Sequence, residues 1–115
     1  MAIDNDLLLV IGSSGIGQGE IDLGEKLMSS FLSMVHDSGQ IPARMIFLNS
    51  GIFLTTDGSP MLDLLKRFEA EGTTILSCGA CLDYYGRKEK LRIGRPTNMK
   101  DTVAAMLSFK RVIRP

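Results

Sequence analysis

TTILSCGACLDYYG, residues 73–86, places the chain's only two cysteines between a predicted strand and a predicted helix. Thr73–Ser77 is a β-branched and aliphatic run that follows Gly72, a pattern typical of a buried strand. The residues after Cys81 contain no helix breaker, so a helix is predicted to begin at Cys81. Cys78 and Cys81 therefore form a C-x-x-C motif where a strand ends and a helix begins.

This position favours reactive thiols. The free N–H groups and the dipole of a helix N-terminus stabilise a nearby anion, and the thiolate is the reactive form of cysteine. No Lys or Arg lies within five residues of either cysteine, so the sequence offers no local charge partner. We expect Cys78 to face a cleft and to be the more accessible thiol, with Cys81 partly covered by its own helix. The alternative is that both are small apolar core residues.

Strands and helices alternate outward from this motif. The strands are predicted at Leu7–Ile11, Arg44–Leu48, Thr73–Ser77, Leu91–Ile93 and Val112–Ile113. The first helix is predicted over Glu20–Asp37. A second helix is predicted to follow Ser59 as its cap, with Pro60 in the first position. The last helix is predicted to be capped by Thr97 or Asn98, with Val103, Met106 and Leu107 facing inward. The alternation of strands and helices predicts the α/β class. Residues 1–115 are expected to form one three-layer α/β/α domain with a mainly parallel, five-stranded sheet.

Three loops follow predicted strands and should meet at one edge of the sheet. They span residues 12–19, 49–58 and 78–81. Ligands of parallel α/β sheets bind beyond the carboxyl ends of the strands, so these loops are the candidate site. Beside the two cysteines, the residues expected to line it are Gly12, Ser13, Ser14, Gly15, Asn49, Ser50, Gly51, Gly79 and Tyr84.

The glycine loop GSSGIGQG, residues 12–19, does not fit a nucleotide site well. Gly12 and Gly17 have the spacing of a P-loop, but Gln18 and Gly19 stand where the Lys and the Ser or Thr are needed. The loop also resembles the dehydrogenase fingerprint, with one residue too few between the first two glycines. Backbone freedom at a tight turn is a sufficient reason for these glycines, and an anion site of backbone N–H groups stays open. We expect no cofactor.

Metal binding within one chain is also not expected. Structural zinc takes four ligands, and the chain has two cysteines and one histidine, His36. His36 is predicted to lie in solvent near the end of the first helix.

Composition bounds the partners and the location. The formal net charge is zero at pH 7, whereas nucleic-acid-binding domains are usually basic. No apolar run approaches the roughly 18 residues of a membrane span. Leu7–Ile11 is too short and lacks the basic flank of a signal peptide, so we expect a cytoplasmic protein.

Ile52, Phe53 and Leu54 form an apolar run in a loop, which predicts a homo-oligomer with this loop at the interface.

Across nearly its whole length the chain resembles the DsrE/DsrF-like sulfur-relay family, and within it the C-terminal domain of YedF-type selenium-metabolism proteins. The stretches that carry the resemblance are the glycine loop with EIDLGEKLMSSFL, then FLNSGIFLTTDGSP, ILSCGACLDYYG and GRPTNM. The family has a cysteine after its third strand and a glycine eight residues later, matched by Cys78 and Gly86. The resemblance implies that Cys78 carries a persulfide. Cys81 matches only the YedF-like branch.

Three hypotheses follow. The first is a sulfur or selenium relay protein that exchanges the persulfide of Cys78 with a carrier protein as donor or acceptor, with Cys81 as a possible resolving thiol. The second is a dithiol-disulfide redox protein. The third is a non-catalytic oligomeric assembly module.

Overall fold

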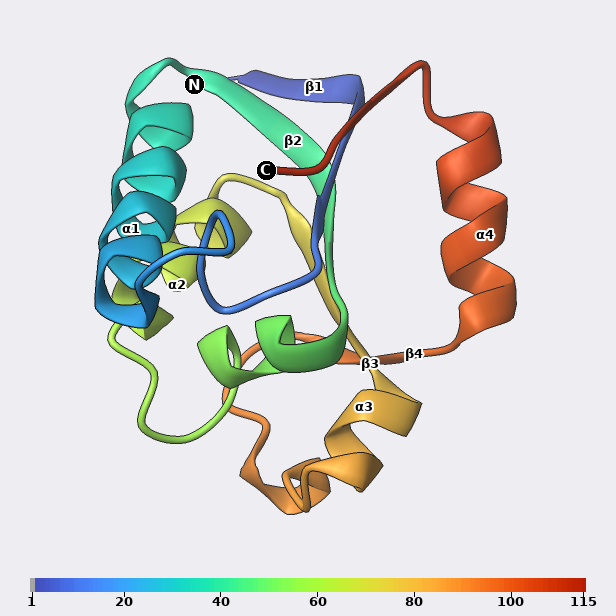
Figure 1. Ribbon diagram of the computed structural model, residues 1–115. Helices are drawn as coiled ribbons and strands as arrows, with labels where there is room; N and C mark the ends of the chain where they lie inside the picture. The colour runs from blue at the N-terminus through green and yellow to red at the C-terminus, as the bar shows by residue number, and fades with distance from the viewer. Residues whose placement is uncertain (1) are drawn as a thin grey trace.

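The computed structural model describes residues 2–115 (Figure 1). The strands are β1 (Ala2–Ile11), β2 (Gln40–Phe47), β3 (Thr74–Cys78), β4 (Arg95–Thr97) and β5 (Arg111–Ile113). The α-helices are α1 (Ile21–Asp37), α2 (Leu62–Ala70), α3 (Gly79–Tyr84) and α4 (Met99–Ser108), and the 3₁₀ helices are η1 (Asn49–Leu54) and η2 (Lys88–Lys90). Over this described part of the chain, no helix combines the length and the apolar character that crossing a membrane requires.

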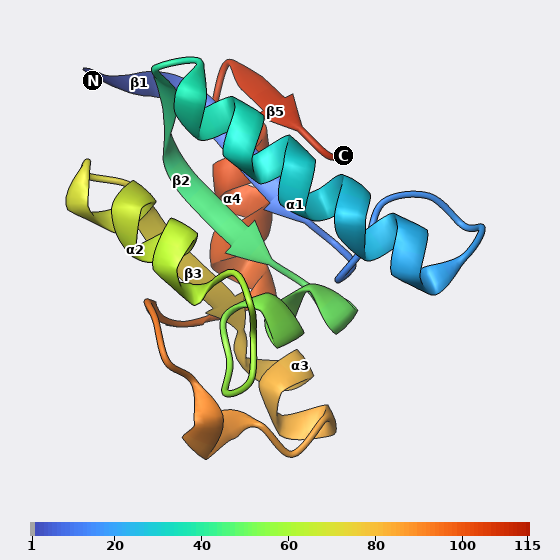
Figure 2. The same cartoon turned by 90° about the vertical axis from the view of Figure 1, so that its left-hand side faces the viewer.

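The strands form one parallel sheet in the order β4-β3-β2-β1-β5. Leu8 of β1, for example, pairs with Arg44 of β2 on one side and Val112 of β5 on the other. Helices α1 and α2 cover one face, α4 covers the other, and α3 lies beyond the carboxyl ends of the strands (Figures 1 and 2). The predicted three-layer α/β/α domain with a parallel five-stranded sheet is confirmed.

The apolar run of β1 joins the two halves of the core. Leu9 and Ile11 belong to the larger cluster under α1 and α2, and Leu8 and Val10 belong to the smaller cluster under α4. Successive side chains of a strand point to opposite faces, so an uninterrupted apolar run suits a strand that is covered on both. Burying one such side chain contributes about 1.5–3 kcal/mol to stability.

Several predicted strand bounds are wrong. Strand β1 starts at Ala2, because Ala2, Ile3 and Asp4 already pair with β2 before a register shift between Asp4 and Leu8. Strand β4 is Arg95–Thr97 and not Leu91–Ile93. Ile93 is buried, but Gly94 follows it at φ 71°, and regular pairing with β3 begins only after that turn.

The inward face of α4 also differs from the prediction. Val103 and Leu107 are 43% and 83% exposed, whereas Thr102 and Ala105 are buried. Met106 packs against the core as predicted, so only Val103 and Leu107 are placed wrongly. The predicted cap is confirmed, since the Asn98 side chain accepts the Asp101 N–H at 2.8 Å. Ser59 does not cap α2 directly; its hydroxyl accepts the N–H of Met61, one residue before the helix.

The apolar run predicted to form a subunit interface lies in η1. Ile52 and Leu54 are buried in the chain's own core. Phe53 packs edge-on against Tyr85, with 4.8 Å between ring centroids. The run therefore gives no support to the expected homo-oligomer, which stays a prediction.

Gly94 and Gly86 offer a matched test of the β3–β4 junction. Both have positive φ, 71° and 66°. A Cβ atom on Gly94 would overlap the carbonyl oxygen of Ile75, whereas one on Gly86 would meet nothing within 4 Å. We expect Gly86→Ala to lower the free energy of unfolding by about 1–2 kcal/mol, from backbone strain alone. Gly94→Ala should lower it by at least about 3 kcal/mol, because β4 must also move. Urea unfolding measures both, and equal losses would contradict the packing argument.

Candidate functional site

Three segments meet at the carboxyl edge of the sheet, as the loop positions predicted (Figure 1). The N–H of Leu48, just before η1, donates to the carbonyl oxygen of Ile11 at 2.9 Å. In the loop after β1, the N–H of Ser14 donates to Ser50 Oγ at 3.2 Å. On the other side of η1, the N–H of Asn49 donates to Cys81 Sγ at 3.1 Å. The 3₁₀ helix therefore lies between the glycine loop and the cysteine motif and contacts both.

Two of the predicted lining glycines allow these segments to approach. A Cβ atom on Gly51 would overlap the carbonyl oxygen of Ile11, so η1 can lie against the end of β1 only with glycine there. A Cβ atom on Gly15 would lie 2.9 Å from the backbone carbon of Gly24 in α1. These glycines are therefore required by packing.

Cys78 closes β3 and caps the following helix. Its Sγ accepts the N–H of Cys81 at 3.3 Å, and α3 begins at Gly79, two residues earlier than predicted. The side chain is 6% exposed. The expectation that Cys78 would be the accessible thiol is therefore wrong: the helix that starts at Gly79 covers it, and Cys81 is the thiol that reaches solvent.

Cys81 lies in the first turn of α3 and is partly exposed. Burial raises the pKa of its thiol, and the hydrogen bond with the Cys78 side chain raises it further, while the N–H of Asn49 acts in the opposite direction. The raised pKa disfavours the thiolate form of Cys81.

A shallow hollow of about 380 Å³ opens beside Cys81, and Tyr84 and Tyr85 form part of its lining. Tyr84 is 84% exposed, at the surface of this hollow. Tyr85 was not predicted as a site residue, although it is the residue four positions after Cys81. Its hydroxyl donates to Asn49 Oδ1 at 2.8 Å, which ties α3 to η1. Asn49 adopts φ 51°, a left-handed conformation that asparagine tolerates better than most residues.

The predicted lining residues do not form one cavity. Asn49 and Tyr84 line the hollow at Cys81, together with Ala80 and Tyr85. Ser13, Ser14, Gly15 and Ser50 line a second hollow of about 350 Å³ around the glycine loop. Gly12, Gly51 and Gly79 line neither of these two hollows. Gly79 instead lies against β4, where a Cβ atom would come 3.2 Å from the Thr97 carbonyl oxygen.

His36 lies in the core and not in solvent as predicted. It is 9% exposed and packs edge-on against Phe68 of α2, with 5.0 Å between ring centroids. Among residues 2–115, no three His, Cys, Asp or Glu side chains are placed to hold a metal ion together.

The fold is similar to those of two solved structures. One is the crystal structure of the ychN protein from E. coli, with TM-score 0.69 and 15% identity, covering 97% of this chain and 100% of that one. The other is MTH1491 from Methanobacterium thermoautotrophicum, described as a protein of unknown function, with TM-score 0.69 and 14% identity over 97% of this chain and 100% of that one. Both have the DsrE-like fold, and at these identities the likeness shows the fold alone. No family model and no curated protein matches the sequence.

The pKa of Cys81 can be tested by removing its neighbour. In Cys78→Ala the hydrogen bond between the thiols is lost, but the burial of Cys81 remains. We expect the midpoint of Cys81 alkylation by iodoacetamide, followed against pH by peptide mapping, to move down from its wild-type value. It should stay above the value of about 8.5 for a free cysteine, because burial still disfavours the thiolate. The urea-unfolded protein is the control. A midpoint that does not fall, or that falls below the unfolded value, would contradict this account.

Proposed function

We propose that the chain is a sulfur or selenium relay protein that carries the transferred atom on Cys78, with Cys81 as the resolving thiol. The observation that carries the proposal is the hydrogen-bonded thiol pair at the carboxyl edge of the sheet. The Cys81 N–H donates to Cys78 Sγ, and the interaction between the two side chains raises the pKa of the Cys81 thiol. The resemblance to the sulfur-relay family supports Cys78 as the carrier, and its YedF-like branch also has Cys81.

The hydrogen bonds of the two thiols suggest different roles for them. The raised pKa keeps the Cys81 thiol protonated at neutral pH, so it acts as the donor toward Cys78. The Cys78 sulfur then accepts this hydrogen bond in addition to the backbone N–H of Cys81. The thiolate is the nucleophile in persulfide transfer, and these contacts support the assignment of that role to Cys78.

The uptake and delivery steps each exchange one sulfur–sulfur bond. The Cys78 thiolate attacks the outer sulfur of a donor persulfide, forms Cys78–S–SH and releases the donor thiolate. An acceptor thiolate then attacks the same outer sulfur, takes it as a new persulfide and restores the Cys78 thiolate. With selenium as cargo, the outer atom is selenium and the bond changes are the same.

Cys81 offers a second outcome for the loaded protein. Its thiolate attacks the inner sulfur of Cys78–S–SH, a disulfide forms between the two cysteines, and hydrosulfide leaves with the outer sulfur. An external thiol must then reduce the disulfide before the next cycle. The raised pKa of Cys81 makes this reaction slow at neutral pH, which leaves time for delivery.

The hollow beside Cys81 is the proposed approach to the pair. It is open to solvent and lined by Asn49, Tyr84 and Tyr85. Since Cys78 is covered, a partner that docks here must displace part of α3 or receive the cargo after α3 moves.

We propose sulfur- or selenium-carrier proteins as donor and acceptor, with the chain acting in the cytoplasm as a homo-oligomer.

The contact between the thiols also favours a second candidate, a dithiol-disulfide redox protein. In that case the pair exchanges electrons with a substrate disulfide and never holds an additional sulfur atom. A disulfide forms between Cys78 and Cys81 while the substrate disulfide is reduced to two thiols.

Intact-mass measurement after exposure to a persulfide donor separates the two candidates. Relay predicts a mass increase of one sulfur atom, and redox chemistry predicts only the loss of two hydrogen atoms. We expect Cys78→Ser to abolish loading and Cys81→Ser to load and to keep its persulfide longer, because the resolving thiol is absent. The double variant is the blank, and circular dichroism checks folding. Loading of Cys78→Ser would reverse the assignment of the two thiols, and no loading of either the wild type or Cys81→Ser would exclude the relay.

A further inference from the structure

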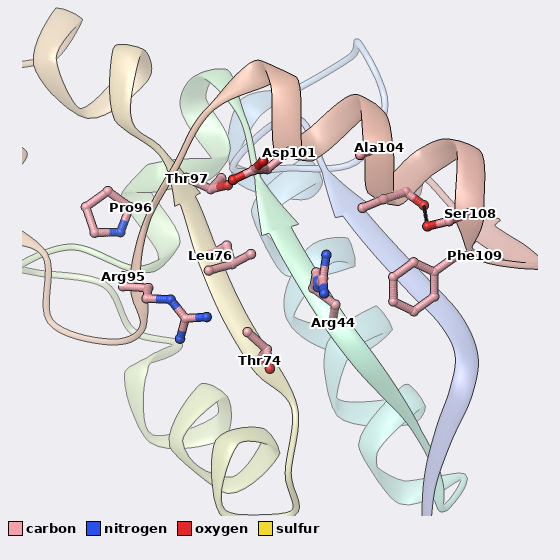
Figure 3. A pocket seen from close by; sticks show the side chains of 11 residues that line it. Arg44, Thr74, Leu76, Arg95, Pro96, Thr97, Asp101, Ala104, Ser108 and Phe109 are labelled. Carbon is pink, nitrogen blue, oxygen red and sulfur yellow. Dashed lines mark hydrogen bonds between the residues drawn. The ribbon is translucent and has the colours of Figure 1, made fainter.

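A third hollow lies on the α4 face of the sheet, away from the thiols. Its volume is about 420 Å³, and it lies between α4 and strands β2, β3 and β4 (Figure 3). Only α4 covers this face, whereas both α1 and α2 cover the opposite one (Figure 1). The surface of β3 and β4 beside α4 is therefore left open.

Two arginines enter this hollow from strands on either side of β3. Arg44 of β2 pairs with Thr74 of β3, and Arg95 of β4 pairs with Leu76 of β3. Thr74 and Leu76 are two residues apart and share one face of the strand, so both arginines lie on that face. Figure 3 shows the two arginines flanking β3, with Thr74 and Leu76 between them. Strands two apart are separated by about 9–10 Å, a gap that two arginine side chains can close from opposite sides.

Neither guanidinium group has an anionic partner. Over residues 2–115, the ion pairs are Arg92 with Asp57 and Arg111 with Asp4, and neither Arg44 nor Arg95 donates a hydrogen bond to the protein. Arg44 is half-buried on a central strand, with Cζ 5.3 Å from the centre of the Phe109 ring. A guanidinium group has five N–H donors, and covering it without an acceptor costs free energy.

We propose that this hollow binds a small organic oxyanion, a carboxylate or phosphate attached to an apolar body. Arginine presents paired N–H groups that match both kinds of oxyanion, and one bound anion would serve both side chains and relieve their repulsion. The volume lies in the range of small-molecule sites and exceeds what inorganic phosphate needs. Leu76, Ala105 and Phe109 supply apolar lining for the rest of the ligand.

Asp101 of α4 sets the orientation of the ligand. Its carboxylate lines the same hollow and accepts the side-chain N–H of Asn98 at 3.3 Å. It repels an anion from the start of α4, so the oxyanion should lie toward the arginines. The site is on a face of the sheet and shares no lining residue with the hollow at Cys81. The proposal therefore stands whether or not the chain is a relay protein.

Calorimetric titration with phenyl phosphate and benzoate tests the site. We expect saturable binding of at least one of them, and the tighter of the two identifies the head group as phosphate or carboxylate. Arg44→Gln and Arg95→Gln should each weaken binding about fivefold or more, because each removes one charge-assisted contact. Asp101→Asn should tighten it. Arg67→Gln is the matched control, since Arg67 is an exposed arginine on α2 at the opposite face and should leave binding unchanged.

Other outcomes would overturn the proposal. Phenol binding as tightly as phenyl phosphate would mean that the charge is not recognised. An equal loss in Arg67→Gln would mean non-specific attraction to surface charge. Arg95 is exposed, so Arg95→Gln keeps the test decisive even if Arg44→Gln alters the fold by circular dichroism. Absence of saturable binding of either anion at millimolar concentration would exclude the site.

Discussion

Gly51 lies against the carbonyl oxygen of Ile11, and any larger residue at this position would push η1 away from β1. The same oxygen accepts the N–H of Leu48 at 2.9 Å, so the contact is held by a hydrogen bond as well as by shape. With η1 placed there, the next N–H, that of Asn49, points at the sulfur of Cys81. One glycine contact thus positions a backbone donor for a thiol 32 residues further along the chain.

The two thiols differ because the backbone around them differs. Cys78 ends a central strand and lies under the helix that it caps, while Cys81 lies one turn further on and reaches the surface. Each sulfur accepts one backbone N–H, but the two donors come from different segments. The N–H of Cys81 donates to the sulfur of Cys78, and the N–H of Asn49 donates to the sulfur of Cys81. A movement of η1 would therefore change the surroundings of Cys81 first and leave the cap at Cys78 in place.

The sequence was sufficient for the fold class because alternation and apolar runs are local signals. The runs at Leu7–Ile11 and Thr73–Ser77 predicted β1 and β3 although not their full bounds, and the C-x-x-C was placed correctly at a strand end. Exposure was predicted wrongly for Cys78, because it depends on where α3 begins, and the sequence does not show that Cys78 itself is the cap. Tyr85 was missed because its partner Asn49 is distant in sequence. The lining splits into two hollows because η1 lies between them.

The all-parallel sheet has a consequence for how the chain folds. Neighbouring strands are not closed by a short turn, since each parallel pairing requires a crossover, and α1 alone occupies 17 residues between β1 and β2. Pairings between distant segments form late in folding, because the entropy of loop closure must be overcome first. Cys78 and Cys81 are only three residues apart and meet early. The two thiols are therefore near each other before η1 brings the N–H of Asn49 to Cys81.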